Sequence, residues 1–206
     1  MLFRSMRAAT SDKAIREKIV LIGSASTGKT SLLNRFAHDC FTTVTQSTIG
    51  ASFIQKVINV DGVDVKLEIW DTGGSEKYRS LAPMYYRDAR GAILVYDITN
   101  EASFQEAEEW YNEFRERGMS SAVVVCAANK CDLESQRKVS KQTGEEFMMQ
   151  NQLEFLKETS ALSGEGVKEL FYDLTKSLLK LAPQEQMNDS IEITPNEDVK
   201  DKGCNC

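Results

Sequence analysis

The sequence has no long hydrophobic run, no surplus of basic residues and only one histidine. No window approaches the roughly 20 apolar residues that a membrane-spanning helix needs, and the best candidate, 122–128, is better read as a buried strand. Lys and Arg number 25 against 31 Asp and Glu, which gives a formal net charge of −6. Nucleic-acid binding needs a cationic surplus, so we expect a protein that binds no nucleic acid. Because no membrane-spanning run is present, we expect it in the cytosol.

Targeting signals and metal-binding cysteine pairs are missing as well. The N-terminal stretch mixes Arg with scattered apolar residues and has no signal-peptide core, and Leu2 excludes N-myristoylation. Cys40, Cys126 and Cys131 lie far apart or without the paired spacing of a zinc site. The single histidine, His38, is expected at a solvent-facing helix end without a functional role.

Strand patterns alternate with helix patterns along the middle of the chain. Two extended runs flank Asp61-Gly62, and a DG turn between such runs predicts a β-hairpin. The continuous apolar runs 91–97 and 122–128 are typical of strands buried on both faces of a parallel sheet. The other expected elements are strands at 18–22 and 154–157, a helix that begins at 31–36, and helices at 101–117, 140–151 and 166–181.

This alternation predicts an α/β fold with a single P-loop domain over residues 15–182. We expect a mostly parallel six-stranded sheet with one antiparallel edge strand and helices on both faces. A loose arm is expected at 1–14 and a flexible tail at 183–206, where polar and charged residues take over.

The segment 23–30 is a complete G-x-x-x-x-G-K-[ST] motif between an apolar strand and a helix. In such a loop, Gly28 lets the backbone approach a phosphate chain, Lys29 reaches the terminal phosphates, and Thr30 offers its hydroxyl to Mg²⁺. A chance Gly/Ser turn is the alternative, and the flanking strand and helix argue against it. The predicted phosphate contacts are Ala25, Ser26, Thr27, Gly28, Lys29, Thr30 and Ser31.

The segment Asn129-Lys130-Cys131-Asp132 follows a buried strand and indicates which base is bound. A carboxylate at Asp132 can accept from N1–H and the 2-amino group of guanine, a donor pair that adenine lacks. Asn129 would serve the N7 edge, and the stem of Lys130 would pack on the base. Alone this is only a polar turn, but downstream of a P-loop it favours a guanine nucleotide over the adenine that a P-loop ATPase or nucleotide kinase requires.

Two further motifs follow in order. Trp70-Asp-Thr-Gly-Gly closes the second hairpin run, where Asp71 can hold Mg²⁺ through water and the N–H of Gly74 can meet a γ-phosphate. The loop Ser160-Ala161-Leu162 follows the last expected strand, and the N–H of Ala161 can donate to guanine O6. Each is a common sequence by itself, and its meaning comes from its position.

With these motifs in place, residues 15–182 resemble the Ras superfamily of small GTPases, and specifically its Rab branch. The segments 46–53, 78–87 and 95–99 carry the Rab resemblance, and the first two are most similar to the early-endosomal Rab subfamily. The resemblance implies a monomer that binds Mg²⁺ and hydrolyses GTP to GDP. It also implies that Thr48 binds both the metal and the γ-phosphate and that Phe41 stacks on the base.

The resemblance further implies that Phe53, Trp70 and Tyr85 form an aromatic cluster that effector proteins recognise. The alternative is that these three are ordinary core aromatics, and the sequence leaves that choice open. Exposure of the aromatics beside the switch segments would favour recognition.

One position departs from the family in a way that concerns catalysis. The usual Asp-Thr-Ala-Gly-Gln-Glu reads Asp-Thr-Gly-Gly-Ser-Glu over 71–76, so Ser75 replaces the Gln that positions the attacking water. Its shorter side chain predicts intrinsic hydrolysis lower by about 10²–10³-fold. Gly73 in place of Ala predicts a more mobile second switch segment. The candidate catalytic residues are Lys29, Thr48, Gly74 and Ser75, and a GTP-bound scaffold that does not turn over is the alternative.

The chain ends in Gly-Cys-Asn-Cys, which is similar to the Rab C-x-C ending that receives geranylgeranyl groups on both cysteines, here Cys204 and Cys206. Two lipids give stable anchoring where one gives marginal binding, and no polybasic patch supplements them. Incidental thiols are the alternative. The resemblance places the protein on the cytosolic face of intracellular membranes, endosomal in kind, cycling with the cytosol. The partners implied are an exchange factor, a GTPase-activating protein, a GDP-dissociation inhibitor, a prenylation escort and effectors.

Overall fold

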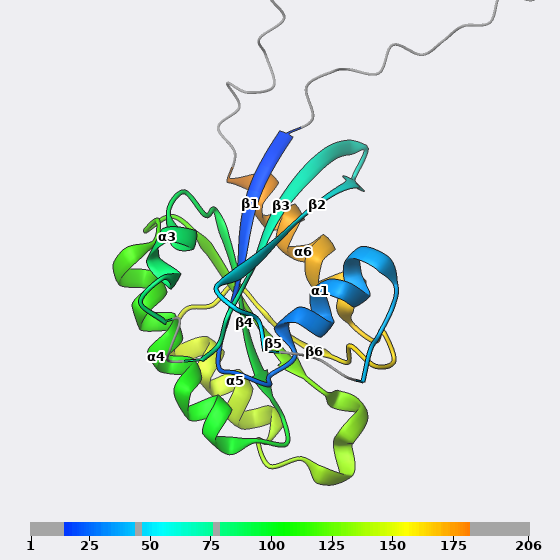
Figure 1. The fold of residues 1–206 in the computed structure, drawn as a ribbon, viewed down its shortest axis with the longest axis vertical. Coiled ribbons are helices and arrows are strands. Elements are labelled where there is room, and N and C mark those ends of the chain that lie inside the picture. Colours follow the sequence, from blue (N-terminus) through cyan, green and yellow to red (C-terminus); the bar gives the residue numbers. More distant parts are fainter. Residues whose placement is uncertain (1–14, 44–46, 76–78, 182–206) are drawn as a thin grey trace, which may run out of the picture.

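The computed structural model describes residues 15–43, 47–75 and 79–181, and within them six strands form one sheet (Figure 1). The strand order is β2-β3-β1-β4-β5-β6. The edge strand β2 runs antiparallel to β3, and the other neighbouring pairs are parallel. The predicted α/β fold with one antiparallel edge strand is thereby confirmed. The strands are β1 (Ile15–Ile22), β2 (Ala51–Val60), β3 (Val63–Thr72), β4 (Gly91–Asp97), β5 (Val123–Asn129) and β6 (Leu156–Thr159).

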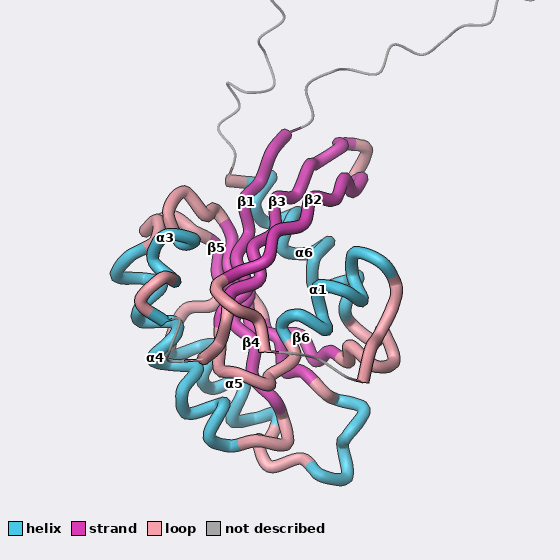
Figure 2. The backbone as a smooth tube through the Cα atoms, in the orientation of Figure 1, coloured by secondary structure: helices cyan, strands magenta, loops and turns pink. Residues whose placement is uncertain are grey.

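Helices cover both faces of this sheet, and Figure 2 shows them as separate groups on either side of the strands. One hydrophobic cluster joins a sheet face to α1 and α6, and a second joins the opposite face to α3, α4 and α5. The helices are α1 (Lys29–His38), α3 (Ala82–Tyr86), α4 (Glu101–Arg117), α5 (Lys141–Gln150) and α6 (Val167–Lys180), with a 3₁₀ helix at Cys131–Gln136.

Local sequence explains where several of these elements begin and end. The hairpin between β2 and β3 turns at Asp61 and Gly62, which both have positive φ. Along β3 the side chains of Val65, Leu67 and Ile69 are fully buried, while the charged Asp64, Lys66 and Glu68 that alternate with them are not. The Asn100 side chain accepts from two backbone N–H groups at the start of α4, and Ser140 caps α5 in the same way. The alternating pattern and the caps therefore agree with the observed elements.

The structure differs from the sequence-based expectation at several elements. Strand β1 is Ile15–Ile22 rather than 18–22, because it pairs with β3 from Ile15 onward. The last strand is Leu156–Thr159 rather than 154–157, because its parallel pairing with β5 aligns Leu156 with Cys126 and Thr159 with Asn129. Helix α3 and the 3₁₀ helix were not predicted, since each is too short to show a helical period. Helix α1 begins at Lys29, directly after the left-handed Gly28.

Five strands run parallel, so their carboxyl ends meet at one edge of the sheet, where loops of such folds bind ligands. The P-loop follows β1, Asp71 lies near the end of β3, and the loops at 129–132 and 160–162 follow β5 and β6. The arm at 1–14 and the tail at 183–206, with Cys204 and Cys206, lie outside the described residues. No helix of the described ranges is both long and apolar enough to cross a membrane.

Candidate functional site

The P-loop connects β1 to α1 and needs glycine at both ends. Gly23 has φ 131°, and a Cβ there would lie 2.3 Å from the carbonyl oxygen of Val95. Gly28 has φ 94°, and a Cβ there would lie 2.4 Å from Nδ2 of Asn129. A side chain at either position would push the loop away from the neighbouring strand ends. Gly28 thus admits the side chain of Asn129, a reason for this glycine that the motif alone did not reveal.

Two adjoining pockets open beside this loop. The first, of about 100 Å³, is the phosphate-side pocket, lined by Ala25, Ser26, Gly28, Lys29, Thr30, Ser31, Ser47, Thr48, Thr72, Gly74 and Ser75. The second, of about 410 Å³, is the base-side pocket, lined by Ser26, Gly28, Ser31, Phe41, Thr42, Thr43, Asn129, Lys130, Asp132, Leu133, Ala161 and Leu162. They share Ser26, Gly28 and Ser31, so the P-loop forms a wall common to both.

Most of the predicted nucleotide and metal residues come together in these pockets, and Thr27, Asp71 and Ser160 are buried just behind them. Thr27 is almost fully buried, and its hydroxyl donates to the carbonyl of Ser24 at 3.0 Å. Ser160 is buried beneath the loop that carries Ala161. The sequence reasoning assigned no role to Ser47, Thr72, Thr42, Thr43 and Leu133, which also line the pockets. Their only signal was adjacency to assigned residues.

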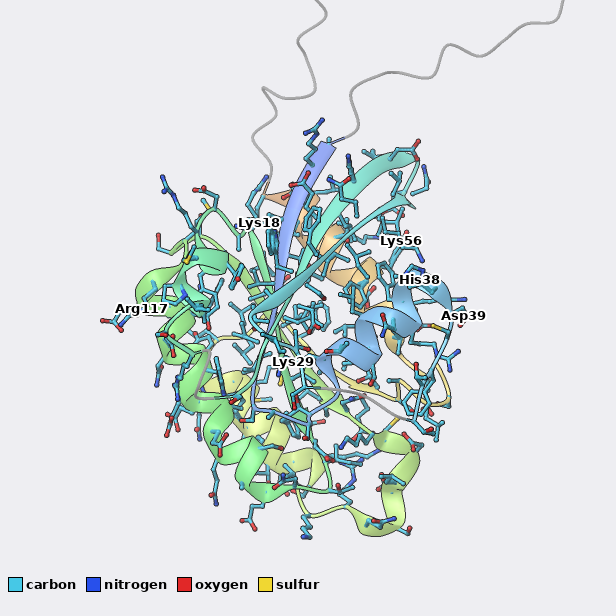
Figure 3. The ribbon with its side chains drawn as sticks, in the orientation of Figure 1. Lys18, Lys29, His38, Asp39, Lys56 and Arg117 are labelled. Atoms are coloured by element: carbon cyan, nitrogen blue, oxygen red, sulfur yellow. The ribbon has the colours of Figure 1, made fainter. Side chains whose placement is uncertain are left out.

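Lys29 stands at the start of α1 and is 5% exposed (Figure 3). Its ammonium donates to the carbonyl oxygens of Gly23 at 2.6 Å and Ser24 at 2.7 Å. Burial lowers its pKa to about 8, and the nearby Asp71 carboxylate acts in the opposite direction. The P-loop therefore curls around a buried cation that is held by its own carbonyl groups.

Three oxygen-bearing side chains meet beside Lys29. The Thr30 hydroxyl lies 2.8 Å from that of Thr48 and donates to Oδ2 of Asp71 at 2.7 Å. Asp71 is fully buried, and burial raises its pKa against the opposing effect of these hydrogen bonds. Its Oδ1 has no hydrogen-bond partner among the described residues. An unsatisfied buried carboxylate oxygen next to two hydroxyls is an arrangement that suits a hard cation.

No group of three or more His, Cys, Asp or Glu side chains in the described ranges is placed to hold a metal ion. A cation at Asp71 would therefore depend on the threonine hydroxyls and on oxygens brought by a ligand or water. Such a site is typical of Mg²⁺, which retains several water ligands and binds few protein carboxylates.

Gly74 packs directly on the P-loop. A Cβ added to it would lie 2.5 Å from the backbone nitrogen of Ala25 and 2.5 Å from Nζ of Lys29. Next to it, the N–H of Gly73 donates to the carbonyl oxygen of Gly50 at 2.8 Å. The segment that ends β3 is thus joined both to the P-loop and to the residue before β2.

Asn129 connects the loops around the base-side pocket. Its Nδ2 donates to the carbonyl oxygen of Thr27 at 2.8 Å, and its Oδ1 accepts from the Thr159 hydroxyl at 3.2 Å. The next residue, Lys130, has φ 67° and forms an ion pair with Asp97 at 2.6 Å. Both side chains hold the loop in place from within the protein.

Asp132 lies at the mouth of the base-side pocket, and its Oδ1 accepts from the Ser160 hydroxyl at 2.5 Å. The same hydroxyl oxygen accepts from the N–H of Ser163 at 3.0 Å. The hydroxyl therefore links the loop after β5 to the loop after β6 and restricts the rotation of the carboxylate.

The three aromatics predicted to form a cluster lie together at the β2–β3 end of the sheet. Ring centroids are 4.9 Å apart for Phe53 and Trp70 and 5.3 Å apart for Trp70 and Tyr85. Phe53 is 44% exposed, whereas Trp70 and Tyr85 are half-buried and pack against the hydrophobic core, so the cluster extends from the core to the surface. Ile49 and Met84 add exposed apolar surface on the segments that carry it.

Comparison with known proteins agrees with this arrangement. A sequence model of the Ras family matches residues 18–180. The chain is 44% identical over 189 residues to the Ras-related protein RABF2a of Arabidopsis thaliana, and the aligned region covers 92% of this chain and 93% of that protein. It is 40% identical over 198 residues to the Ras-related protein Rab-5A of Dictyostelium discoideum, covering 94% and 98%. It is also 40% identical over 197 residues to the human Ras-related protein Rab-8B, covering 92% and 94%.

The family match spans most of the chain, and the Rab relatives are matched over nearly their whole length. The chain therefore belongs to the Ras family, in its Rab branch.

Proposed function

We propose that this chain is a Rab-like switch that binds GTP and GDP in the two adjoining pockets, hydrolyses GTP slowly and regulates vesicular membrane traffic. The main support is that one wall, the P-loop, is common to a pocket containing Lys29 and a pocket containing Asp132. A ligand that fills both must carry phosphates at one end and a base at the other.

The base preference rests on Asp132. Its carboxylate, oriented by Ser160, can accept from both N1–H and the 2-amino group of guanine. Adenine presents no such pair of donors and would leave the carboxylate without partners on the base, which discriminates strongly against ATP. The N–H of Ala161 completes the readout by donating to O6, and Phe41 stacks on the base.

Mg²⁺ fits the oxygen set of Thr30, Thr48 and Asp71. The hydroxyls of Thr30 and Thr48 and the carboxylate of Asp71 would hold the ion, and the buried Oδ1 of Asp71 would then gain a partner. When bound, the ion neutralises charge on the β- and γ-phosphate oxygens. The tie of Thr48 to this centre makes the first switch segment sensitive to the γ-phosphate.

The chain's own residues do the remaining work of hydrolysis. The ammonium of Lys29 neutralises phosphate charge, and the N–H of Gly74 donates to a γ-phosphate oxygen. Ser75 lines the phosphate-side pocket, but its short side chain cannot bridge the attacking water and the γ-phosphate as a glutamine does. Water is therefore held less firmly for in-line attack, and the GTP-bound state persists.

The test is single-turnover hydrolysis of GTP by the full chain. Ser75→Gln should raise the intrinsic rate by about 10- to 100-fold, within the effect of one positioned transition-state group. Ser75→Ala is the matched control and should leave the slow rate almost unchanged. Equal rates for wild type and Ser75→Gln would contradict slow intrinsic turnover. If only Ser75→Gln hydrolyses measurably, the chain is instead a GTP-bound regulatory scaffold.

The nucleotide that co-purifies with the protein gives an independent test of the ligand. Denaturing the purified protein and separating the released nucleotides should yield GTP or GDP. Recovery of ATP or ADP would favour a P-loop ATPase or nucleotide kinase and would contradict the role given to Asp132.

We also propose that residues 15–182 form the switch domain and that the tail 183–206 anchors it to membranes through geranylgeranyl groups on Cys204 and Cys206. The matches to RABF2a and Rab-5A support an endosomal membrane with exchange through the cytosol. The partners in this cycle are an exchange factor, a GTPase-activating protein, a GDP-dissociation inhibitor and a prenylation escort. The exposed cluster of Phe53, Trp70 and Tyr85 would be the effector surface.

Imaging an N-terminally tagged chain tests the anchor. The wild type should mark endosomal membranes, whereas Cys204→Ser with Cys206→Ser should be diffuse in the cytosol. Cys40→Ser removes an exposed cysteine of the domain and serves as the control that should keep the membrane pattern. Membrane localisation of the double variant would contradict lipid anchoring at the tail.

A further inference from the structure

Arg35 joins two parts of the base-side pocket that are far apart in the sequence. It lies on α1, and its side chain is 17% exposed. Its Nε donates to the carbonyl oxygen of Ala161 at 2.9 Å, and its Nη2 donates to that of Leu162 at 2.8 Å. The loop before α6 accordingly runs beside α1 (Figure 1). One guanidinium thus holds two successive carbonyl groups of the loop that faces the base.

The same guanidinium reaches the opposite wall of the pocket. Nη1 donates to the backbone oxygen of Asp39 at 3.0 Å and to its Oδ1 at 3.1 Å. Figure 3 shows Asp39 at the end of α1. Asp39 is in a left-handed conformation, and its N–H returns to the carbonyl oxygen of Arg35. Two residues later the chain reaches Phe41, which lines the base-side pocket.

These contacts fix the peptide groups that would read the base. A peptide is planar, so holding the carbonyl of Ala161 also fixes the N–H of Leu162 in the opposite direction. The preceding peptide is fixed in the same way, because the carbonyl of Ser160 accepts from the N–H of Gly164 at 2.8 Å. Gly164 packs on the stem of Arg35, with a built Cβ 3.6 Å from its Cδ. The loop is therefore rigid, and Arg35 fastens it to α1.

We propose that Arg35 is a positioning residue for guanine: it holds both walls of the base-side pocket together, sets the rate of nucleotide release and strengthens recognition of O6. Arg35 does not line the pocket itself, and it acts through Ala161 on one side and Asp39 on the other. Displacing the segment after α1 would pull on the same guanidinium that holds Ala161. Movement of that segment and release of the base are therefore coupled. This inference rests on the proposed binding of guanine nucleotides.

The geometry requires an arginine rather than any cation. Three nitrogens of a rigid planar group serve three different carbonyl oxygens and one carboxylate oxygen. A lysine has a single nitrogen and cannot reach both walls at once. Arg35→Lys should therefore release nucleotide at a rate between those of wild type and Arg35→Gln.

The experiment measures dissociation of fluorescently labelled GDP from the full chain with Mg²⁺ present. Loss of hydrogen bonds from a charged donor predicts at least about 10-fold faster release from Arg35→Gln. The matched control is Arg115→Gln. Arg115, on α4, also donates to loop carbonyls, those of Ser120 and Ala122, but it does not line either pocket. It should release GDP at the wild-type rate.

A second readout separates positioning from general loosening. Affinities are compared for GDP, for 6-thioguanosine diphosphate, which replaces O6 by sulfur, and for inosine diphosphate, which lacks the 2-amino group. In Arg35→Gln the preference for GDP over the 6-thio analogue should shrink about threefold or more, because the loop that carries the N–H of Ala161 is no longer fastened to α1. The preference for GDP over inosine diphosphate reports on Asp132 and should stay the same.

Several outcomes would overturn the inference. One is a GDP release rate for Arg35→Gln within twofold of wild type. Another is an affinity loss that is equal for all three nucleotides. If Arg35→Gln does not fold, a wild-type release rate in Arg35→Lys is decisive in the same direction. If the wild-type chain itself binds no GDP, the proposed function fails. If the wild type binds GDP and Arg35→Gln releases it at the same rate, only the inference about Arg35 fails.

Discussion

Asp132 and Ser160 form a pair in which the hydroxyl orients the carboxylate. Substitutions at the two positions should therefore change nucleotide binding in different ways. Asp132→Asn exchanges an acceptor for a group that can also donate, and a donor there suits the 2-oxo group of xanthine. We expect this variant to lose GDP affinity by about 100-fold and to gain xanthosine diphosphate binding. Competition of unlabelled nucleotides against labelled GDP or its xanthine analogue measures both.

Ser160→Ala is the companion to that prediction. It removes the orienting hydroxyl and leaves the carboxylate, so GDP binding should weaken by about 10-fold without any gain for xanthine. A variant at position 160 that acquires xanthine binding would show that the carboxylate is not the group that selects the base.

Gly74 is the position at which a single methyl group would separate the end of β3 from the P-loop. Its built Cβ falls 2.5 Å from backbone and side-chain atoms of the loop. Gly74→Ala should therefore lower single-turnover GTP hydrolysis by about 10-fold or more, because the N–H donor is displaced from the γ-phosphate. GDP affinity should change little, since GDP has no γ-phosphate.

Gly62→Ala is the control for that substitution. Gly62 has φ 88°, and a Cβ there meets nothing within 4 Å. It should reduce stability by about 1 kcal/mol and leave hydrolysis unchanged. A Gly74→Ala variant that hydrolyses GTP at the wild-type rate would contradict the close approach.

Helix α4 contacts both the P-loop and the segment before α3. Its Glu106 accepts a hydrogen bond from the Ser24 hydroxyl, and its Glu109 and Glu113 pair with Arg79 at 3.1 Å and 2.6 Å. The Arg79 guanidinium also lies 4.7 Å from the ring centroid of Trp110. Helix α4 therefore packs against and stabilises both the P-loop and the segment before α3.

Arg79→Ala should lower the free energy of unfolding by about 1–2 kcal/mol, the sum of two part-exposed ion pairs and one cation–π contact. Urea denaturation measures it. Arg117→Ala is the matched control. The contact of Arg117 to Glu116 is 4.0 Å long and exposed, so the free energy of unfolding should change by no more than about 0.5 kcal/mol. Equal effects of the two would contradict a specific role for Arg79.

Strand β1 carries a fully buried carboxyl group, Glu17, whose Oε1 accepts from Arg90 at 2.9 Å. Burial raises the pKa of Glu17, and Arg90 only partly opposes that rise. The folded state thus binds the proton more tightly than the unfolded chain. The stabilisation is full below the unfolded pKa of about 4.3 and is lost as the pH rises through the folded pKa.

Glu17→Gln removes this titration. The unfolding free energy of the variant minus that of the wild type should therefore increase as the pH rises above the unfolded pKa of about 4.3 and level off above the folded pKa. Urea titrations at a series of pH values test the slope, and a difference that is constant or decreases with pH would contradict the buried acid.

Much of the fold follows from local patterns. The hairpin at Asp61-Gly62, the buried strands β4 and β5 and the capped helices α4 and α5 were all predicted in place. The position of β6 was not, because the pairing of Leu156 with Cys126 is decided by the neighbouring strand. The P-loop and the loops at 129–132 and 160–162 were predicted from motifs, and parallel strand ends bring them together. Arg35 gave no signal, since its partners Ala161 and Leu162 lie 126 and 127 residues away.

The ligand pockets are built from loops after several strands, so binding should stabilise the molecule as a whole. A ligand that binds only the folded state at about 1,000 times its Kd adds about 4 kcal/mol. We expect GDP with Mg²⁺ to raise the thermal midpoint markedly and a chelator to reverse part of the shift. ATP with Mg²⁺ is the control, and a shift by ATP equal to that by GDP would contradict guanine selectivity.

The bonds of Asn129 have a kinetic consequence. They run from protein to protein, to Thr27 on one side and from Thr159 on the other, so they do not depend on a nucleotide. Three loops are thereby fixed relative to one another before any ligand arrives. Rebinding after release should then be limited by diffusional encounter rather than by assembly of the pocket, and the association rate should rise linearly with nucleotide concentration without reaching a plateau.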